Sequence, residues 1–227
     1  SLPSSTPIDP TTFCLKAGMI PDPWQIRVLE STSQELALNC SRQVGKTTIV
    51  AILAAWTALT SPTDIIIAAP GERQAMELLR KAARSLRAYG EAGVKDNASE
   101  FELTNGSRLL AMPAKEGTVR GYSPGLLIVD EAGWVPDEIM ISLRPMLAVT
   151  KGRLVTLSTP HGKQGWWWQD WATDEGLEKV EVPWWACPRI DATFMEREKQ
   201  KHGLLFSQEY ECQFLDNGVS VFDVSAA

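Results

Sequence analysis

The sequence is constrained most strongly by short apolar runs that alternate with helix-like segments. DIIIAA (64–69), GLLIVDE (125–131) and GRLVTLSTP (152–160) have apolar centres, and the last two end in polar residues. Continuous apolar runs of this length are typical of parallel strands that are buried on both faces of a sheet. Helical patterns cover about 45–59 and 72–89. The alternation predicts an α/β fold with a mainly parallel sheet flanked by helices.

The composition is that of a folded protein. With 227 residues, of which 44% are hydrophobic, the chain is long and apolar enough for a substantial core. Its four cysteines form no C-x-x-C pair, which argues against a zinc site or a secreted disulfide scaffold and favours a reducing, intracellular setting. The longest apolar stretch, 49–59, is about half of the ~20 residues that a membrane span needs. We therefore expect a soluble protein.

The net charge of −6 argues against a surface that is basic all over, as in many stand-alone nucleic-acid-binding proteins. It does not exclude a motor that contacts DNA through a small patch. The visible basic cluster consists of Arg80, Lys81, Arg84 and Arg87. We interpret it first as the solvated face of a helix, with a DNA-contacting patch as the alternative.

The segment ALNCSRQVGKTTIVAIL (37–53) has the pattern of a strand, a phosphate-binding loop and a helix. Gly45, Lys46 and Thr47 match the end of G-x-x-x-x-G-K-[ST], although Cys40 stands at the position of the first glycine. In such a loop, backbone N–H groups and the helix dipole attract phosphate, the lysine reaches the β- and γ-phosphates, and the hydroxyl binds Mg²⁺. The candidate nucleotide-binding residues are Cys40, Ser41, Arg42, Gln43, Val44, Gly45, Lys46, Thr47 and Thr48.

Two carboxylates end the apolar run GLLIVDE. Asp130 follows four apolar residues and is placed to hold Mg²⁺ through water, together with the Thr47 hydroxyl. Glu131 is placed to orient and deprotonate the water that attacks the γ-phosphate. The alternative is an acidic pair that only caps a turn. This alternative is disfavoured because the pair occurs together with an upstream phosphate loop. The two motifs predict an ATPase that needs Mg²⁺.

Further candidates are expected near the same sheet edge. The ends of the phosphate-loop strand and of the two later strands should meet at one edge, where α/β proteins bind ligands. Ser158, Thr159 and Pro160 are therefore candidates for sensing the γ-phosphate and linking its loss to movement. A hydroxyl that caps the turn before the proline is equally consistent. Gln25 is a candidate for a hydrogen bond to an adenine edge, and Trp24 for packing in the core.

The sequence divides into four parts. Residues 1–21, rich in Ser, Thr and Pro, are predicted to form an N-terminal arm, and residues 22–164 the P-loop ATPase core. Within the core, EFELTNGSRLLAM carries Asn105-Gly106, a strong hairpin signal. Residues 165–215, which contain WWWQDW, a candidate strand LEKVEVP and a charged helix, are predicted to form a small lid-like subdomain. Residues 216–227 are predicted to be a linker.

Five segments occur in a characteristic order: PWQIRVLE, SRQVGKTT, LLIVDEAG, STPHGKQGWW and FSQEYECQFLDNG. Together they resemble the ATPase domain of the large terminase subunit of tailed bacteriophages, from about residue 23 to residue 222. The resemblance implies a P-loop ATPase of the additional-strand, catalytic-glutamate (RecA-like) type that pumps double-stranded viral DNA into a preformed capsid. The loop of that family often lacks the first glycine, so Cys40 is expected there.

The resemblance also implies roles for two arginines. Arg42, in the phosphate loop, would contact phosphate within its own subunit. Arg120, in TVRGYSPGLLIVDE, would act on the ATP of a neighbouring subunit. An ordinary surface-loop residue is the alternative for Arg120.

The partners implied by the resemblance are double-stranded DNA, the portal protein, the small terminase subunit and further copies of this chain. The copies would form a ring when assembled on the capsid, and the chain alone would be a monomer. The location would be the cytoplasm of the host cell. Complete family members carry a nuclease domain after a segment like EYECQFLDNGVSVF. We expect no nuclease activity in this chain, and we expect Asp216 and Asp223 to be linker residues.

Two other functions fit part of the pattern. A helicase-like DNA translocase is suggested by AAPGERQAMELL, DEAG and STP, but the remaining length has no room for a second phosphate-loop-like domain. A nucleotide-regulated binding module without turnover is disfavoured by Glu131, since a switch that does not hydrolyse ATP has no need of that base.

Overall fold

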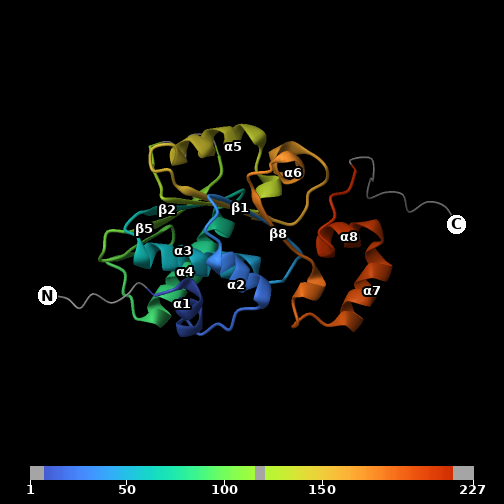
Figure 1. The fold of residues 1–227 in the computed structure, drawn as a ribbon, viewed down its shortest axis with the longest axis horizontal. Helices are drawn as coiled ribbons and strands as arrows, with labels where there is room; N and C mark the ends of the chain where they lie inside the picture. Colours follow the sequence, from blue (N-terminus) through green and yellow to red (C-terminus); the bar gives the residue numbers. More distant parts are fainter. Residues whose placement is uncertain (1–7, 116–120, 217–227) are drawn as a thin grey trace.

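The computed structural model describes residues 8–115 and 121–216, which form an eight-stranded sheet with helices on both faces (Figure 1). In spatial order the strands are β3, β4, β5, β2, β6, β7, β1 and β8. The strand bounds are β1 (Glu35–Cys40), β2 (Asp64–Ala69), β3 (Lys95–Asp96), β4 (Glu100–Glu102), β5 (Arg108–Pro113), β6 (Leu126–Asp130), β7 (Arg153–Ser158) and β8 (Glu178–Val182). In this spatial order, the neighbouring strands from β5 through β2, β6, β7 and β1 to β8 all pair in parallel.

The helices connect and cover these strands. Their bounds are α1 (Pro10–Lys16), α2 (Pro23–Glu30), α3 (Lys46–Thr60), α4 (Glu72–Tyr89), α5 (Asp137–Leu143), α6 (Gly165–Thr173), α7 (Ala192–His202) and α8 (Leu204–Tyr210). Three short 3₁₀ helices are η1 (Ala132–Trp134), η2 (Arg144–Leu147) and η3 (Trp184–Ala186). None of the described helices is long and apolar enough to cross a membrane.

The sheet separates two hydrophobic layers. One face packs against α1 to α4, and the other packs against α5, α6 and η1 (Figure 1). The alternation along β2 shows the division, because Ile65 and Ile67 belong to the first layer and Ile66 and Ala68 to the second. Successive strand residues point to opposite faces, so a strand covered on both faces must be apolar throughout. The predicted α/β fold is confirmed.

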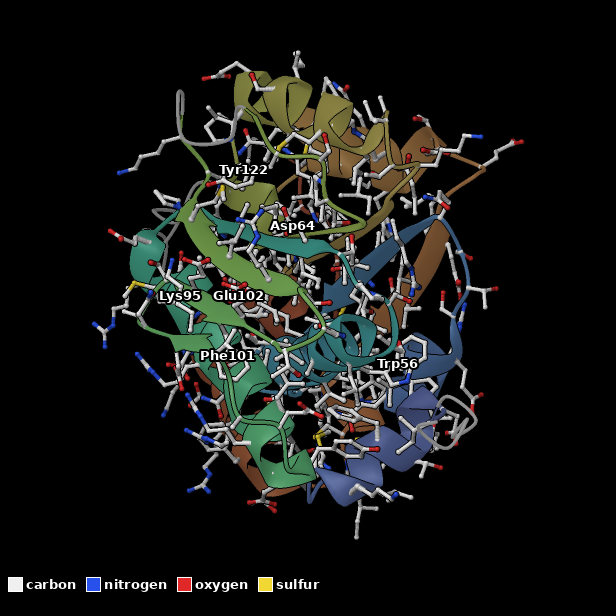
Figure 2. The ribbon with its side chains drawn as sticks, turned by 90° about the vertical axis from the view of Figure 1, so that its left-hand side faces the viewer. Trp56, Asp64, Lys95, Phe101, Glu102 and Tyr122 are labelled. Atoms are coloured by element: carbon white, nitrogen blue, oxygen red, sulfur yellow. The ribbon has the colours of Figure 1, made fainter. Side chains whose placement is uncertain are left out.

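The predicted hairpin lies at one end of the sheet. β4 and β5 pair antiparallel, and Gly106 between them has a φ of 88°, which a tight hairpin turn requires. β3 extends the hairpin, with Lys95 opposite Glu102. Figure 2 shows this edge of the sheet, where Phe101 is buried and the guanidinium of Arg87 lies 5.4 Å from the centre of its ring.

Part of the segment predicted as an arm is a helix in the first hydrophobic layer. α1 begins after Asp9, whose carboxylate accepts a hydrogen bond from the backbone N of Thr12 (2.8 Å). Phe13 is fully buried, and its ring centre lies 5.2 Å from that of Tyr89. The arm prediction is therefore wrong for residues 10–16. A helix this short depends on tertiary packing for its stability, so its sequence pattern is weak.

The predicted boundary at residue 165 does not separate two packing units. β8 pairs in parallel with β1, so that Leu38 lies opposite Val180. α6 packs on the second face of the sheet through Trp166 and Trp167. The apolar side chains of β8 and α6 need the main core for their burial, which is why they join it. Only α7 and α8 of the predicted subdomain lie beside the sheet, next to β8 (Figure 1).

Candidate active site

The phosphate loop connects the end of β1 to the start of α3, as predicted. Gly45 has a φ of 94°, a left-handed conformation that glycine adopts without strain. The backbone N of Ser41 donates to the carbonyl of Val182 in β8 (2.8 Å), and that of Arg42 donates to the carbonyl of Glu209 in α8 (3.0 Å). The loop is therefore fixed between the sheet and α8, with the first turn of α3 at its end.

The two predicted carboxylates lie at the end of β6. Asp130 is 4% exposed and accepts a hydrogen bond from the backbone N of Glu131 (2.9 Å). Burial raises the pKa of Asp130 to about 6; the neighbouring Glu131 carboxylate adds to the rise, and Lys46 opposes it. The Nζ of Lys46 lies 3.5 Å from Oε1 of Glu131. The loop lysine and the strand-end carboxylate therefore face each other.

A cavity of about 350 Å³ lies between the loop and these carboxylates, a volume within the range of small-molecule sites. It is lined by Arg42, Lys46, Pro70, Gln74, Glu131, Trp134 and Thr159. The cavity brings together four of the predicted residues. Sequence reasoning did not single out Pro70, Gln74 or Trp134. Pro70 directly follows β2, whose carboxyl end lies at the same sheet edge, so the strand pattern already contained that signal.

Several predicted loop residues do not present their side chains to the cavity. Cys40 and Val44 are fully buried, and burial raises the pKa of the Cys40 thiol well above its ordinary value. Ser41 is also buried, and its hydroxyl donates to the carbonyl of Arg42 (3.1 Å). These residues contribute to the loop through their backbone. The loop side chains that reach solvent are Arg42, Gln43, Thr47 and Thr48.

Gln25 lies beside the loop but inside the core. Its Oε1 accepts a hydrogen bond from the backbone N of Asp22 (2.8 Å), and its Nε2 is buried without a hydrogen-bond partner among the described residues. A Cβ on Gly45 would lie 3.3 Å from this Nε2. In this conformation Gln25 supports the loop from within, whereas the predicted adenine contact requires an accessible side chain.

The predicted coupling residues lie at the end of β7, and all three are buried. Thr159 lines the cavity. The hydroxyl of Ser158 accepts a hydrogen bond from the backbone N of Gly133 (3.2 Å), in the turn that follows Glu131. This contact joins the ends of two neighbouring strands. It differs from the predicted alternative, in which a hydroxyl caps the turn before Pro160.

The two predicted arginines have different outcomes. Arg42 lines the cavity, and its guanidinium is ion-paired with the carboxylate of Glu209 in α8. The hydrogen bond to Glu209 raises the pKa of Arg42. Arg120 lies outside the described residues. Sequence reasoning did not single out Glu209 as a site residue, although it lies within the segment FSQEYECQFLDNG, because its pairing with the distant Arg42 appears only in the fold.

The predicted linker begins at Asp216, whose carboxylate lies 2.8 Å from the Nζ of Lys163. Lys163 follows β7, and its backbone N donates to the carbonyl of Leu215 (2.9 Å). The start of the predicted linker therefore lies against the loop after β7. Asp223 lies outside the described residues.

The basic cluster lies on the exposed side of α4. Arg80 is ion-paired with Glu77, and Arg87 is ion-paired with Asp96. Arg84 is exposed as well. The cluster lies on a solvated helix face, as predicted, and its ion pairs reduce the positive charge that this face offers to a polyanion. A DNA-contacting patch stays the alternative.

Two side chains next to residues that line the cavity fit Mg²⁺. Asp130 supplies a buried carboxylate and Thr47 a hydroxyl in the first turn of α3, and oxygen donors of this kind are the ligands that Mg²⁺ prefers. The raised pKa of Asp130 shows that the described side chains stabilise its charged form incompletely, and a divalent cation would supply that stabilisation. No group of three or more His, Cys, Asp or Glu side chains in the described ranges could hold a metal. The cation would therefore be held largely by water and phosphate oxygens.

The sequence model described as "Terminase large subunit, T4likevirus-type, N-terminal" matches residues 37–227 of this chain. The chain belongs to this terminase family. The resemblance found in the motifs is therefore confirmed, and the match includes the phosphate loop, both carboxylates and the residues after β7.

Solved terminase structures share the fold. The ATPase domain of the Thermus phage P74-26 large terminase is 20% identical, with a TM-score of 0.78, and the alignment covers 93% of this chain and 100% of that one. The large terminase of bacteriophage HK97 is 18% identical, with a TM-score of 0.73 over 86% of this chain and 51% of that one.

A third relative was solved with a nucleotide analogue. The large terminase of a thermophilic bacteriophage in complex with ATP-gamma-S is 13% identical, with a TM-score of 0.72 over 86% of this chain and 53% of that one. This chain thus spans about half the length of the second and third of these terminases. The likeness confirms the RecA-like P-loop fold.

Proposed function

We propose that this chain is the ATP-hydrolysing motor domain of a viral DNA-packaging terminase. The observation that carries the proposal is the pairing of Lys46 with Glu131 across the cavity, at 3.5 Å, beside the buried Asp130. A lysine for the phosphates, a carboxylate for the cation and a carboxylate for the water are the parts that phosphoryl transfer to water requires. Membership of the terminase family supports the assignment.

The proposed reaction cleaves the bond between the β-γ bridging oxygen and the γ-phosphorus of ATP. Backbone N–H groups of the phosphate loop and the Nζ of Lys46 bind the β- and γ-phosphates. Glu131 accepts a proton from the attacking water, whose oxygen bonds to phosphorus as ADP leaves. Thr47 and Asp130 would hold Mg²⁺, which when bound would supply neutralisation of the charge that develops on the phosphate oxygens. The products are ADP and inorganic phosphate.

We assign supporting roles to two arginines and to the end of β7. Arg42 contacts a phosphate of its own subunit, since this residue already lines the cavity. Arg120 is supplied to the ATP of a neighbouring subunit. Ser158 and Thr159 sense the γ-phosphate. Thr159 lines the cavity, and the hydroxyl of Ser158 is hydrogen-bonded to the turn after Glu131.

The motor acts on double-stranded DNA and couples ATP hydrolysis to its translocation into a procapsid. The family, together with the terminase ATPase folds that this chain resembles, supports this substrate and its setting. Its partners are the portal protein, the small terminase subunit and further copies of this chain in a ring, in the host cytoplasm. Alone, the chain is monomeric and hydrolyses ATP slowly. Rapid turnover by a demonstrably monomeric sample would contradict this.

The test is ATP turnover and ATP binding by wild type and Glu131→Gln, with Glu138→Gln as the matched control on the exposed side of α5. Glu131→Gln is expected to bind ATP as wild type does and to lose about 10²- to 10⁴-fold in turnover, because its carboxylate acts on water and not on the nucleotide. Equal loss of binding and turnover would give Glu131 a structural role. If the wild-type chain binds ATP but does not hydrolyse it, a nucleotide-regulated module is favoured instead. If the wild-type chain separates DNA strands, a helicase is favoured.

A further inference from the structure

An exposed tryptophan stands next to the proposed catalytic carboxylate. Trp134 ends η1, and its backbone N donates to the carbonyl of Glu131 (2.9 Å). Its side chain is 52% exposed, yet the indole is stacked on the ring of His161, with ring centres 3.6 Å apart and planes inclined by 31°. The stack joins the turn after β6 to the loop after β7.

The turn and the loop are closely packed where the stack joins them. A Cβ on Gly133 would lie 3.1 Å from the Cβ of His161 and 3.2 Å from both Oγ of Ser158 and Cδ1 of Trp167. These distances are shorter than ordinary van der Waals contacts, so a side chain at this position would require its neighbours to shift by a few tenths of an ångström. Movement of the loop would therefore be transmitted directly to the turn that follows Glu131.

The indole of the stack borders two cavities. Trp134 lines the catalytic cavity of about 350 Å³. Both Trp134 and His161 line a second cavity of about 290 Å³, together with Gln164 and Trp167. Removal of the indole would enlarge both spaces and leave η1 without its contact to His161.

The backbone of Glu131 needs such support. Its φ of 49° lies in the left-handed region, which costs energy for a residue with a Cβ and persists only where surrounding contacts impose it. The partner of the stack is itself fixed, because the backbone N of Gly162 donates to Oε1 of Gln208 in α8 (3.0 Å). Burial lowers the pKa of His161, so its ring is neutral near pH 7 and stacks without a charge to desolvate.

We propose that the Trp134–His161 stack is a positioning contact that holds the turn after β6, and with it the Glu131 carboxylate, in the geometry needed to act on the attacking water. The inference rests on the proposed function, since it assumes that Glu131 is the base. Trp134 acts through Glu131 and is a positioning residue.

The test compares Trp134→Ala, Trp134→Phe and Trp185→Ala for kcat, KM and nucleotide affinity. Trp185 is the matched control, because it is 59% exposed and packs edge-on against Trp184 away from both cavities. Trp134→Ala should lower kcat by roughly 10- to 100-fold, as expected for a displacement of about 1 Å at the reacting group, with KM and nucleotide affinity near wild type. Trp134→Phe should recover most of the loss, and Trp185→Ala should match wild type.

A second measurement does not depend on activity. Hydrogen exchange at the amide of Gly133 should be at least tenfold faster in Trp134→Ala and near wild type in Trp134→Phe. An unchanged kcat or unchanged exchange in Trp134→Ala would overturn the inference. An equal loss of kcat and nucleotide affinity would also overturn it, since Trp134 would then contact the nucleotide. Wild-type activity in Glu131→Gln would instead overturn the proposed function, and the role of the stack with it.

Discussion

Helix α3, which follows the phosphate loop, and helix α7, near β8, are stabilised in opposite ways. Nine of the 15 residues of α3 are buried, and this helix packs on the sheet beside α4, with α1 and α2 as further neighbours. Of the 11 residues of α7, only Met195 is buried. The N-terminus of α7 is capped by Asp191, whose carboxylate accepts from the backbone N of Thr193 (3.0 Å), whereas no described side chain caps α3.

This difference has a functional meaning. A helix stabilised by its packing can leave the N–H groups of its first turn without a side-chain cap, and those groups are what a phosphate needs. A helix with little buried surface depends on its caps and opens at low free-energy cost. The comparison predicts that changes near α3 affect chemistry and global stability, and that matched changes in the α7 region affect neither strongly.

The largest effect is expected for Lys46→Ala. Loss of the ammonium removes the point charge that the β- and γ-phosphates need, so ATP turnover should fall by at least about 10³-fold with a matching loss of affinity. The control is Lys201→Ala in α7, which removes a lysine paired only with Glu198 and should leave both quantities within about twofold of wild type. Turnover and nucleotide titration are measured on both. If Lys46→Ala hydrolyses ATP at the wild-type rate, the assignment of residues 40–48 as a phosphate loop is wrong.

The next effect is expected for Arg120→Ala. An arginine that reaches the γ-phosphate contributes about 10³- to 10⁵-fold to the rate in other phosphoryl-transfer enzymes. Turnover by assembled copies should therefore fall by this order while ATP binding stays near wild type. Arg197→Ala, on α7, is the control and should be active. Under assembling conditions, mixing Arg120→Ala with Glu131→Gln should restore activity, because one subunit supplies the arginine and the other the carboxylate. Absence of rescue in proven mixed assemblies would place Arg120 in its own subunit's site.

A stability comparison tests the packing difference itself. Leu53→Ala, in α3, should lower the free energy of unfolding by roughly 2–5 kcal/mol, because Leu53 is fully buried in the first hydrophobic layer. Met195→Ala, in α7, should lower the global value by less than about 1 kcal/mol and instead speed hydrogen exchange locally in α7. Urea denaturation and hydrogen exchange measure both. Equal losses would show that α7 unfolds together with the sheet.

The effect expected for Asp130→Asn has the opposite sign, because this substitution is stabilising. The folded-state pKa of about 6 lies above the ordinary 3.8. The folded state therefore binds more protons than the unfolded state between these values, and wild-type stability falls as pH rises through this window. Without Mg²⁺ or nucleotide, Asp130→Asn should be more stable than wild type at pH 7, by about 3 kcal/mol, and the advantage should disappear below about pH 4.

Asp216→Asn is the control for that measurement. Its carboxylate is 78% exposed and paired with Lys163, so its removal should leave the free energy of unfolding unchanged within about 0.5 kcal/mol. A destabilised Asp130→Asn would show that the carboxylate forms native contacts that outweigh its burial.

The sequence predicted the elements whose patterns are local. The strand GLLIVD, the hairpin at Asn105-Gly106 and the helix over 72–89 each lie where the structure has them, because apolar runs, turn chemistry and helical period are properties of neighbouring residues. The same holds for the phosphate loop and the carboxylate pair; the cavity brings Lys46 of the loop together with Glu131 of the pair. α1 and the pairing of β8 were missed because both depend on burial against distant parts of the chain.

What the sequence determined by itself is the class of chemistry. A loop that ends in Gly45-Lys46-Thr47 and a buried strand that ends in Asp130-Glu131 indicate phosphoryl transfer before any contact is known. Tertiary structure alone decided which side chains surround those motifs: Gln25 behind the loop, Glu209 on Arg42, and His161 against Trp134. The physical reason is that motif chemistry needs a few residues at fixed spacing. Partners such as Arg42 and Glu209 lie far apart in the chain and meet only when the helices pack around the sheet.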